Sequence, residues 1–377
     1  MTDLITLYGM KISMFTGKIR SYLIKQQMDF VERAPVDNHF NQVIKPQIGR
    51  QIIPVIEMPD GEIIQDSTDI IDYLEGQGLA RESTYPKAPL ARLLALIFEL
   101  FGDEGLIRPA MHYRWNYEDR GGDFIRHGFG GFQGPDREAA INEKVERAIE
   151  KFSGFLPPLG INETSIPEIE RAFEELIRVM DAHFERHPYI LGSRPTIGDY
   201  GLMCSLYAHL GRDPVPASLM KNKAPNLYRW TERMNTPHDD LTDMPYYRPS
   251  DDLPESLGPV LDYIGRYFLP EMQVQVDKTN ECLAMLGDIP SGQACTPTPS
   301  ISAIAFGMFR HGDFDMQTVV RPIRLYMLQR VSDYYDTLPE AEQKLARDYL
   351  APSGLDGLLT LKANRRVVRK NHIEVWG

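Results

Sequence analysis

The first eighty residues combine two hydrophobic patterns, short β-rich runs and stretches with apolar residues on one helical face. The β-rich runs predict strands at residues 4–8, 30–31, 52–56 and 62–64. Helical spacing predicts helices over residues 15–27 and after Ser67. The Asp60–Gly61 pair between the last two strands is a strong hairpin signal. The order is βαβ, an intervening segment, then ββα, which indicates a small α/β unit.

Helical periodicity replaces the strand pattern after residue 78, beyond a Pro-containing linker at 85–89. The clearest helix is predicted between Ser165 and His187, where one face is apolar. Ser165 with Glu168 indicates a capping box at its start. Further helical or loop segments are predicted at 90–103 (helix), 236–259 (Pro- and Asp-rich loop), 260–286 (helix) and 317–351 (helix). We therefore expect three domains: an α/β unit at 1–80, an all-helical domain at 90–247 and a helical extension at 248–377.

Charge and composition limit the partners of the chain. With 41 basic and 53 acidic residues the formal net charge is −12, which argues against nucleic acid or an anionic membrane surface. The longest apolar stretch, 93–101, is too short to cross a bilayer, and no signal peptide is recognised at the start. We expect an intracellular, cytoplasmic protein.

The cysteines give no framework for a fold or a metal. Cys204, Cys282 and Cys295 are too few and too irregularly spaced for paired disulfides or a four-thiolate zinc site. We expect free thiols and no bound metal.

A proline inside an apparent strand, Pro54, is the most informative single residue. Proline cannot donate to a β-ladder, so central strands avoid it. One explanation is a cis Ile53–Pro54 bond that exposes the main chain of Val55 as a free edge for an extended peptide. The alternative is an edge-strand proline with no ligand.

Two helix starts offer polar groups to a ligand. At Asp66–Ser67 the serine can cap a helix, whose N–H groups and dipole suit a carboxylate, while Asp66 suits an ammonium group. Ser13 precedes the first helix, where a hydroxyl can donate to an anionic sulfur and lower a thiol pKa. Taken alone, each of them is better explained by ordinary capping.

Together these segments resemble the serine-type, bacterial-like branch of the glutathione S-transferase family. Residues 13–20 (SMFTGKIR) are similar to its Ser-Pro-Phe-x-x-Lys-Val-Arg signature, with Met14 in place of proline. Residues 53–70 resemble its Val-Pro-x-Leu…Glu-Ser-x-x-Ile motif. Residues 191–199 resemble the second-domain motif Leu-x-Gly-x-x-x-Ser-x-Ala-Asp, with Gly198 at the alanine position. The residues themselves predict an N-cap box between Thr196 and Asp199 in this last segment. The resemblance covers about 230 residues and implies a thioredoxin-like first domain.

The resemblance also implies roles for particular residues. Ser13 would stabilise the thiolate of glutathione. The main chain of Val55, in the binding segment Ile53, Pro54 and Val55, would bind its cysteine, and Asp66 with Ser67 would bind the γ-glutamyl end. Tyr8 is the rival thiol activator, although its offset from Arg20 fits the serine register less well.

The implied function is glutathione transfer to a small electrophile, with a role in detoxification, by a homodimer. Alternatives are a glutathione-dependent isomerase, dehalogenase or etherase, or a scaffold that has kept the fold without the activity. Helices after the linker are expected to build the electrophile pocket. The region that could supply it includes Phe101, Met111, His112, Tyr113 and Trp115. The alternative is that these residues belong to the core and that His112 is structural.

The resemblance does not cover residues 248–377. This part is locally basic, through Arg321, Arg324, Arg330, Lys362, Arg365, Arg366, Arg369 and Lys370. These residues are expected to dock on the acidic body or lie in solvent, the alternative being a lid or dimer element. Trp376 predicts an anchored C-terminus.

Overall fold

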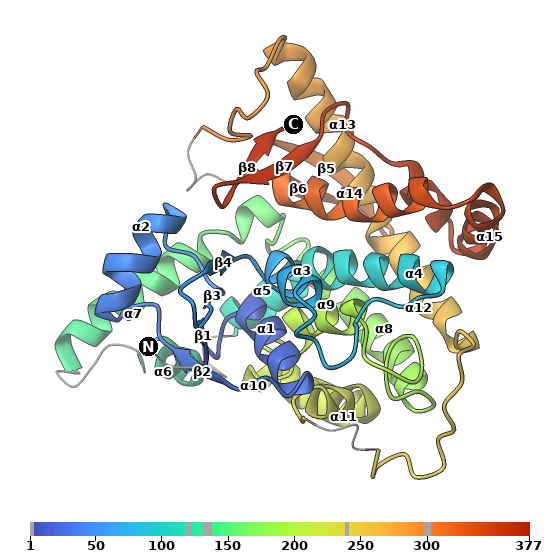
Figure 1. Ribbon diagram of the computed structural model, residues 1–377, viewed down its shortest axis with the longest axis horizontal. Helices are drawn as coiled ribbons and strands as arrows, with labels where there is room; N and C mark the ends of the chain where they lie inside the picture. The colour runs from blue at the N-terminus through green and yellow to red at the C-terminus, as the bar shows by residue number, and fades with distance from the viewer. Residues whose placement is uncertain (1–3, 118–121, 131–137, 238–240, 298–302) are drawn as a thin grey trace.

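The α/β unit at the start of the chain is a four-stranded sheet with helices on both faces (Figure 1). The computed structural model describes residues 4–117, 122–130, 138–237, 241–297 and 303–377. The elements of this unit are β1 (Ile5–Tyr8), α1 (Met14–Lys25), β2 (Phe30–Arg33), η1 (Phe40–Ile44), α2 (Lys45–Ile48), β3 (Val55–Glu57), β4 (Ile63–Gln65) and α3 (Ser67–Gly76). The strand order is β2-β1-β3-β4, with β1 parallel to β2 and the other pairs antiparallel. The predicted element order is confirmed.

Alternation along the strands sends side chains to two separate cores. Leu7 and Ile56 face α1 and α3, and belong to the main hydrophobic cluster. Tyr8 and Val55 face the opposite side and pack with Phe40 of η1. The residues that end β1 and begin β3 are therefore on the face away from α1.

The Ile53–Pro54 peptide bond is cis, immediately before β3. The edge-strand alternative for Pro54 is wrong, because β3 lies between β1 and β4. The predicted free edge at Val55 is also wrong. Val55 pairs with Tyr8 on one side and with Gln65 on the other.

The second domain is helical, as predicted. Its elements are α4 (Pro89–Leu100), η2 (Phe101–Gly105), α5 (Ile107–Trp115), α6 (Gly122–Gly130), α7 (Glu138–Ser153), η4 (Pro157–Leu159), α8 (Ile166–Phe184), α9 (Ile197–Leu206), α10 (Pro214–Lys223) and α11 (Pro225–Arg233). Every residue of α9 is buried, and its start carries the predicted box between Thr196 and Asp199. The box predicted at Ser165 does not form, because Ser165 is already in a helical conformation. Its hydroxyl makes no capping bond and donates to the carbonyl of Gly160 at 2.7 Å.

The extension contains helices within the predicted ranges 260–286 and 317–351, but residues 317–320, predicted as helix, belong to a strand. It also contains two β-hairpins that the sequence analysis missed. Its elements are η5 (Glu255–Leu257), α12 (Gly258–Tyr267), α13 (Leu269–Leu286), β5 (Ala305–His311), β6 (Phe314–Val320), α14 (Pro322–Thr337), α15 (Glu340–Leu350), η6 (Ala351–Ser353), η7 (Leu355–Thr360), β7 (Val367–Lys370) and β8 (Ile373–Trp376). The first hairpin pairs β5 with β6 and the second pairs β7 with β8. In Figure 1 this region lies over α3 and α4, with α14 alongside α4.

One hydrophobic cluster runs from Ile5 in β1 to Trp376 in β8, so the extension shares its core with the two domains. Four extension arginines pair with acidic residues of these domains, which confirms the docking interpretation for Arg321, Arg324, Arg330 and Arg369. Trp376 is 2% exposed, so the chain end is anchored as predicted. Over the described ranges, no helix has the length and apolarity needed to cross a membrane.

Candidate active site

The loop between β1 and α1 places Ser13 at the start of α1 as its N-cap. The Ser13 hydroxyl oxygen accepts a hydrogen bond from the Thr16 main-chain N–H at 3.3 Å. A hydroxyl has one hydrogen to donate, and this bond leaves it free. Ser13 therefore presents a donor next to the positive end of a twelve-residue helix.

Arg114 of α5 holds this loop in place through a hydrogen bond to its main chain. Its guanidinium donates to the carbonyl oxygen of Ile12 at 2.7 Å and forms a two-point contact with Asp213 at 2.7 and 2.9 Å. The Arg114 side chain is only 3% exposed, so its charge requires that partner. This contact joins segments about a hundred residues apart in the chain, so no local sequence pattern predicts it.

Tyr8, the rival activator, is turned to the other face of the sheet. Its hydroxyl donates to Glu57 Oε2 at 3.1 Å, and its ring packs with Phe40. Burial and the Glu57 carboxylate raise the pKa of Tyr8. The single hydroxyl hydrogen is thus committed to Glu57 and not offered to a thiol.

Asp66, and not Ser67, is the N-cap of α3. The Asp66 carboxylate accepts from the Thr68 N–H at 3.0 Å, while Ser67 is the first helical residue. Asp66 has φ of 85°, a conformation that costs a non-glycine residue of order 1–3 kcal/mol and is concentrated at functional sites. Burial alone would raise its pKa, but Arg369, the Thr68 N–H and Lys18 together outweigh burial and the pKa is lowered. Asp66 is therefore charged at neutral pH.

The other predicted site residues flank this helix start. Ile53 and Pro54 come just before β3, and Val55 pairs with Gln65, the residue that precedes Asp66. Ile53 is half-buried, whereas Val55 is fully buried within the sheet. The structure brings the segment at Pro54 close to the start of α3, and the main chain of Ile53 and Pro54 lies outside the ladder.

A buried ionic cluster joins the starts of α1 and α3 to the second domain. Lys18 Nζ lies 2.6 Å from Asp103, 2.8 Å from Glu99 and 3.1 Å from Thr68 Oγ1. Lys18 and Glu99 are fully buried. Burial raises the pKa of Asp103 to about 8, against the opposing effect of Lys18. The sequence contained one signal for this cluster, a lysine on the apolar face of α1.

The region predicted for the electrophile pocket is mostly core. Phe101, Met111 and Tyr113 are buried, and His112 is hydrogen bonded to Glu170 at 2.9 Å, in keeping with its structural interpretation. Burial lowers the pKa of His112. Trp115 is the exception, since it is only partly buried.

Trp115 begins a layer of aromatic rings supplied by three helices. Its ring stacks on Phe129 of α6 at 6.0 Å, and Phe129 stacks on Phe152 of α7 at 5.7 Å. Phe152 and Phe155 are 37% and 43% exposed. The α6 backbone also meets the Ser13 loop, because a Cβ on Gly128 would lie 2.5 Å from Ile12. This exposed aromatic surface is therefore next to the loop that carries Ser13.

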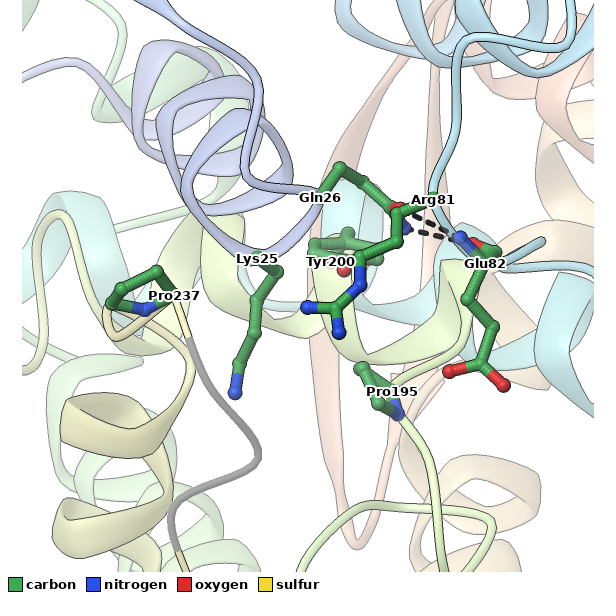
Figure 2. A pocket seen from close by; sticks show the side chains of 7 residues that line it. All are labelled: Lys25, Gln26, Arg81, Glu82, Pro195, Tyr200 and Pro237. Carbon is green, nitrogen blue, oxygen red and sulfur yellow. Dashed lines mark hydrogen bonds between the residues drawn. The ribbon is translucent and has the colours of Figure 1, made fainter.

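Two surface hollows lie elsewhere. Figure 2 shows one of about 270 Å³, where Gln26 and Glu82 are joined by two hydrogen bonds. The other, about 430 Å³, lies beside Tyr8 and His39. Ser13, Ile53, Asp66 and Ser67 line neither hollow. Within the described ranges, no group of three or more His, Cys, Asp or Glu side chains is placed to hold a metal ion.

Comparison with known proteins agrees with the architecture. Residues 7–78 match the family model of the glutathione S-transferase N-terminal domain, and residues 145–237 match that of its C-terminal domain. A thioredoxin-like domain followed by a helical domain is the fold of this family, and the chain belongs to the glutathione S-transferase family. Residues beyond about 240 lie outside both family domains.

Solved structures resemble the chain only distantly. A glutathione S-transferase from Rhodospirillum rubrum is 14% identical, covers 67% of this chain and 97% of its own, and gives a TM-score of 0.40. One from Methylobacterium radiotolerans, in complex with glutathione sulfonate, is 19% identical, with coverages of 66% and 98% and a TM-score of 0.37. A β-etherase from Sphingobium is 17% identical, with coverages of 61% and 94% and a TM-score of 0.42. No curated protein matches the chain.

Proposed function

We propose that this protein is a glutathione transferase in which Ser13 holds the sulfur of glutathione as a thiolate. The observation that carries the proposal is the free hydroxyl hydrogen of Ser13 at the start of α1. A donor at that place stabilises an anionic sulfur more than a neutral thiol. The pKa of the bound thiol is therefore lowered.

The size of the required effect is within reach of these groups. A free thiol has a pKa of about 8.5, and a shift of two units corresponds to about 2.7 kcal/mol. A hydrogen bond to a charged group contributes roughly 1.5–3 kcal/mol, and a helix terminus about 0.3–1 kcal/mol. One serine hydroxyl and one helix terminus are therefore sufficient to lower the thiol pKa by two units.

The remaining contacts with glutathione follow from the start of α3. The Asp66 carboxylate receives the ammonium group of the γ-glutamyl residue, and Ser67 with the helix N–H groups receives its carboxylate. The cysteine of glutathione lies along the segment of Ile53, Pro54 and Val55, where the main chain of Ile53 is outside the ladder. The strained backbone of Asp66 supports a functional role for this turn.

The reaction is a nucleophilic substitution or addition. The thiol proton passes to solvent, and a sulfur lone pair forms the new C–S bond. In a substitution the leaving group departs with the electron pair of the broken bond. The aromatic layer of Trp115, Phe129 and Phe152 beside the Ser13 loop supports an electrophile with an apolar or aromatic portion.

The test is the rate of conjugation of glutathione to a reactive aryl halide. Ser13→Ala removes the donor, and we expect kcat/KM to fall at least tenfold at pH 6.5, where the uncatalysed thiol is protonated. Ser13→Thr, which keeps a hydroxyl, is the matched control and should retain activity. Equal rates for wild type and Ser13→Ala would contradict the role of Ser13.

The same assay, read by mass spectrometry with a substrate panel, separates the related reactions. A glutathione conjugate that accumulates indicates transfer. A rearranged product with glutathione regenerated indicates an isomerase. An absence of glutathione-dependent turnover across the panel favours the scaffold alternative.

We also propose that the chain forms a homodimer. The faces of α3 and α4 that contact α14 belong to the interior of one chain, so a second subunit has to use other surfaces. Light scattering should give the mass of two chains, and the mass of one chain would contradict the proposal.

A further inference from the structure

The hairpin β7–β8, at the far end of the chain, reaches the start of α3. It brings Arg369 to Asp66, with Nη1 2.8 Å from Asp66 Oδ2. The same guanidinium donates from Nη2 to Gln65 Oε1 at 3.0 Å and lies 3.4 Å from Asp69. A residue that is 300 positions away in sequence thus contacts the turn to which the γ-glutamyl group is assigned.

Arg369 is buried, and some of its hydrogen-bond donors have no partner among the described residues. Its side chain is 6% exposed, and its Nε and Nη1 atoms donate no hydrogen bond to any of the described residues. The contact with Asp66 is an ion pair whose N–H groups are not aligned on the carboxylate. A guanidinium group carries five N–H donors in one plane, and two of them can bond a carboxylate at the same time. Arg369 therefore has donors left for an acceptor from outside the chain.

A second arginine, Arg50, and a second carboxylate, Asp69, belong to the same cluster. Arg50 contacts Gln65 Oε1 at 3.3 Å, and its buried Nε also has no hydrogen-bond partner among the described residues. The carboxylates remain accessible, with side-chain exposures of 22% for Asp66 and 28% for Asp69. The cluster offers unsatisfied cationic donors and partly open carboxylates side by side.

Such a cluster matches the two charges of an amino-acid head group. We propose that Arg369 binds the α-carboxylate of the γ-glutamyl group while Asp66 binds its ammonium, so that the extension completes the glutathione site. This inference rests on the proposed function. It makes the extension a determinant of specificity, because a thiol without the zwitterionic head group cannot use both partners.

The chemistry of the ligand gives a test that needs no variant. Calorimetry on the full chain compares reduced glutathione with 4-aminobutyryl-cysteinyl-glycine, which keeps the ammonium group but lacks the α-carboxylate. We expect wild type to bind the analogue about tenfold or more weakly, as for the loss of a hydrogen bond between charged groups. Equal affinities would overturn the inference.

Arg369→Gln then identifies the residue responsible. The variant should bind glutathione more weakly than wild type, and its preference for glutathione over the analogue should shrink to the part that Ser67 and the helix N–H groups supply. Arg366→Gln is the matched control, since Arg366 adjoins the same strand but pairs with Asp333 and is 57% exposed. It should bind as wild type does. Arg369→Lys, which keeps the charge without the fork, should fall between wild type and Arg369→Gln and covers the case in which Gln prevents folding.

The outcomes separate the two proposals. If wild type binds glutathione and Arg369→Gln binds it equally or more tightly, Arg369 only docks the hairpin and the inference is wrong. If wild type does not bind glutathione, the proposed function is wrong and this inference falls with it.

Discussion

At the scale of single residues, hydrogen-bond direction supports the proposal of Ser13 over Tyr8 as the thiol activator. Each hydroxyl has one hydrogen to donate. Tyr8 gives it to Glu57, whereas Ser13 receives a hydrogen bond from Thr16 and keeps its own hydrogen. The sequence placed Tyr8 in the first strand and Ser13 just ahead of the first helix, but it could not show which partner the hydroxyl of each would bond.

Tyr8→Phe is therefore expected to leave the chemistry intact. The variant loses a hydrogen bond to Glu57 on the far face of the sheet, so stability should fall by about 1 kcal/mol. Its kcat/KM for glutathione conjugation should stay within twofold of wild type. A loss comparable to that of Ser13→Ala would make Tyr8 the activator after all.

The residue scale also shows where sequence analysis reached its limit. Ser13 and the cis bond at Pro54 were predictable because each depends on neighbours in sequence. Val55 was misread, because a free edge depends on which strands flank it. Arg369 was assigned only to a basic tail, because nothing local indicates that its partner is Asp66.

At the scale of elements, helix starts depend on how the chain enters them. Thr196 is extended, at φ −118° and ψ 172°, and its box with Asp199 forms. Ser165 is already helical, at φ −90° and ψ −23°, so its side chain cannot reach the third helical N–H. The two segments look equivalent in sequence, and only the preceding turn distinguishes them.

Glycines set how closely α9 approaches α4. A Cβ on Gly201 would lie 2.6 Å from Glu99 Cα, and one on Gly102 would lie 2.3 Å from the backbone of Gly201. Gly198, where the family motif has alanine, would place a Cβ 2.8 Å from that of Phe98. This close packing explains the departure from the motif, because alanine at 198 would force the two helices apart.

Gly201→Ala tests this contact. The added methyl meets backbone atoms that cannot move away alone, so the free energy of unfolding should fall by about 1–3 kcal/mol or more. Gly76→Ala is the control, since Gly76 is the last residue of α3 and has no atom within 4 Å of the added Cβ. Urea unfolding should find that variant unchanged or slightly more stable, and equal losses for both would refute the packing argument.

The missed hairpins show the same dependence on context. Residues 305–311 alternate between buried and exposed positions, but Gly307 and the charged turn weaken the pattern. The buried face of β5 packs on α13, which the sequence does not place beside it. Four strands of the extension were therefore not predicted from hydrophobic periodicity, whereas long helices such as α8 and α13 were.

At the scale of the whole molecule, buried ion pairs bind the extension to the body. Glu271 of α13 lies 2.6 Å from two nitrogens of Arg108 in α5 and also pairs with Arg324 of α14. Glu271 is 1% exposed and Arg324 is fully buried. Removing one member leaves uncompensated charge in the interior, which costs roughly 3–5 kcal/mol.

Glu271→Gln should therefore destabilise the protein strongly, and Glu281→Gln should not. Glu281 lies on the same helix, but its pair with Lys278 is exposed and contributes at most about 1 kcal/mol. Urea unfolding at pH 7 measures both variants. A loss below about 1 kcal/mol for Glu271→Gln would show that the interior pairs are not needed to dock the extension.

The pH dependence of that difference has a definite sign. Burial would raise the pKa of Glu271, but Arg108 and Arg324 outweigh it and hold the pKa well below the ordinary 4.5. The stability from Glu271 is therefore fully present above pH 4.5 and is lost as the pH falls toward the lowered pKa. The gap between wild type and Glu271→Gln should be constant from pH 7 to pH 5 and shrink in more acid solution.

The central claim is that this protein lowers the pKa of a bound glutathione thiol through Ser13. The most direct measurement is a pH titration of glutathione-thiolate ultraviolet absorbance with excess protein, corrected for tyrosine ionisation. The account predicts a bound-thiol pKa about two units below the free value of about 8.5, returning toward that value in Ser13→Ala. A bound thiol with an unshifted pKa, in a protein shown separately to bind glutathione, would contradict it.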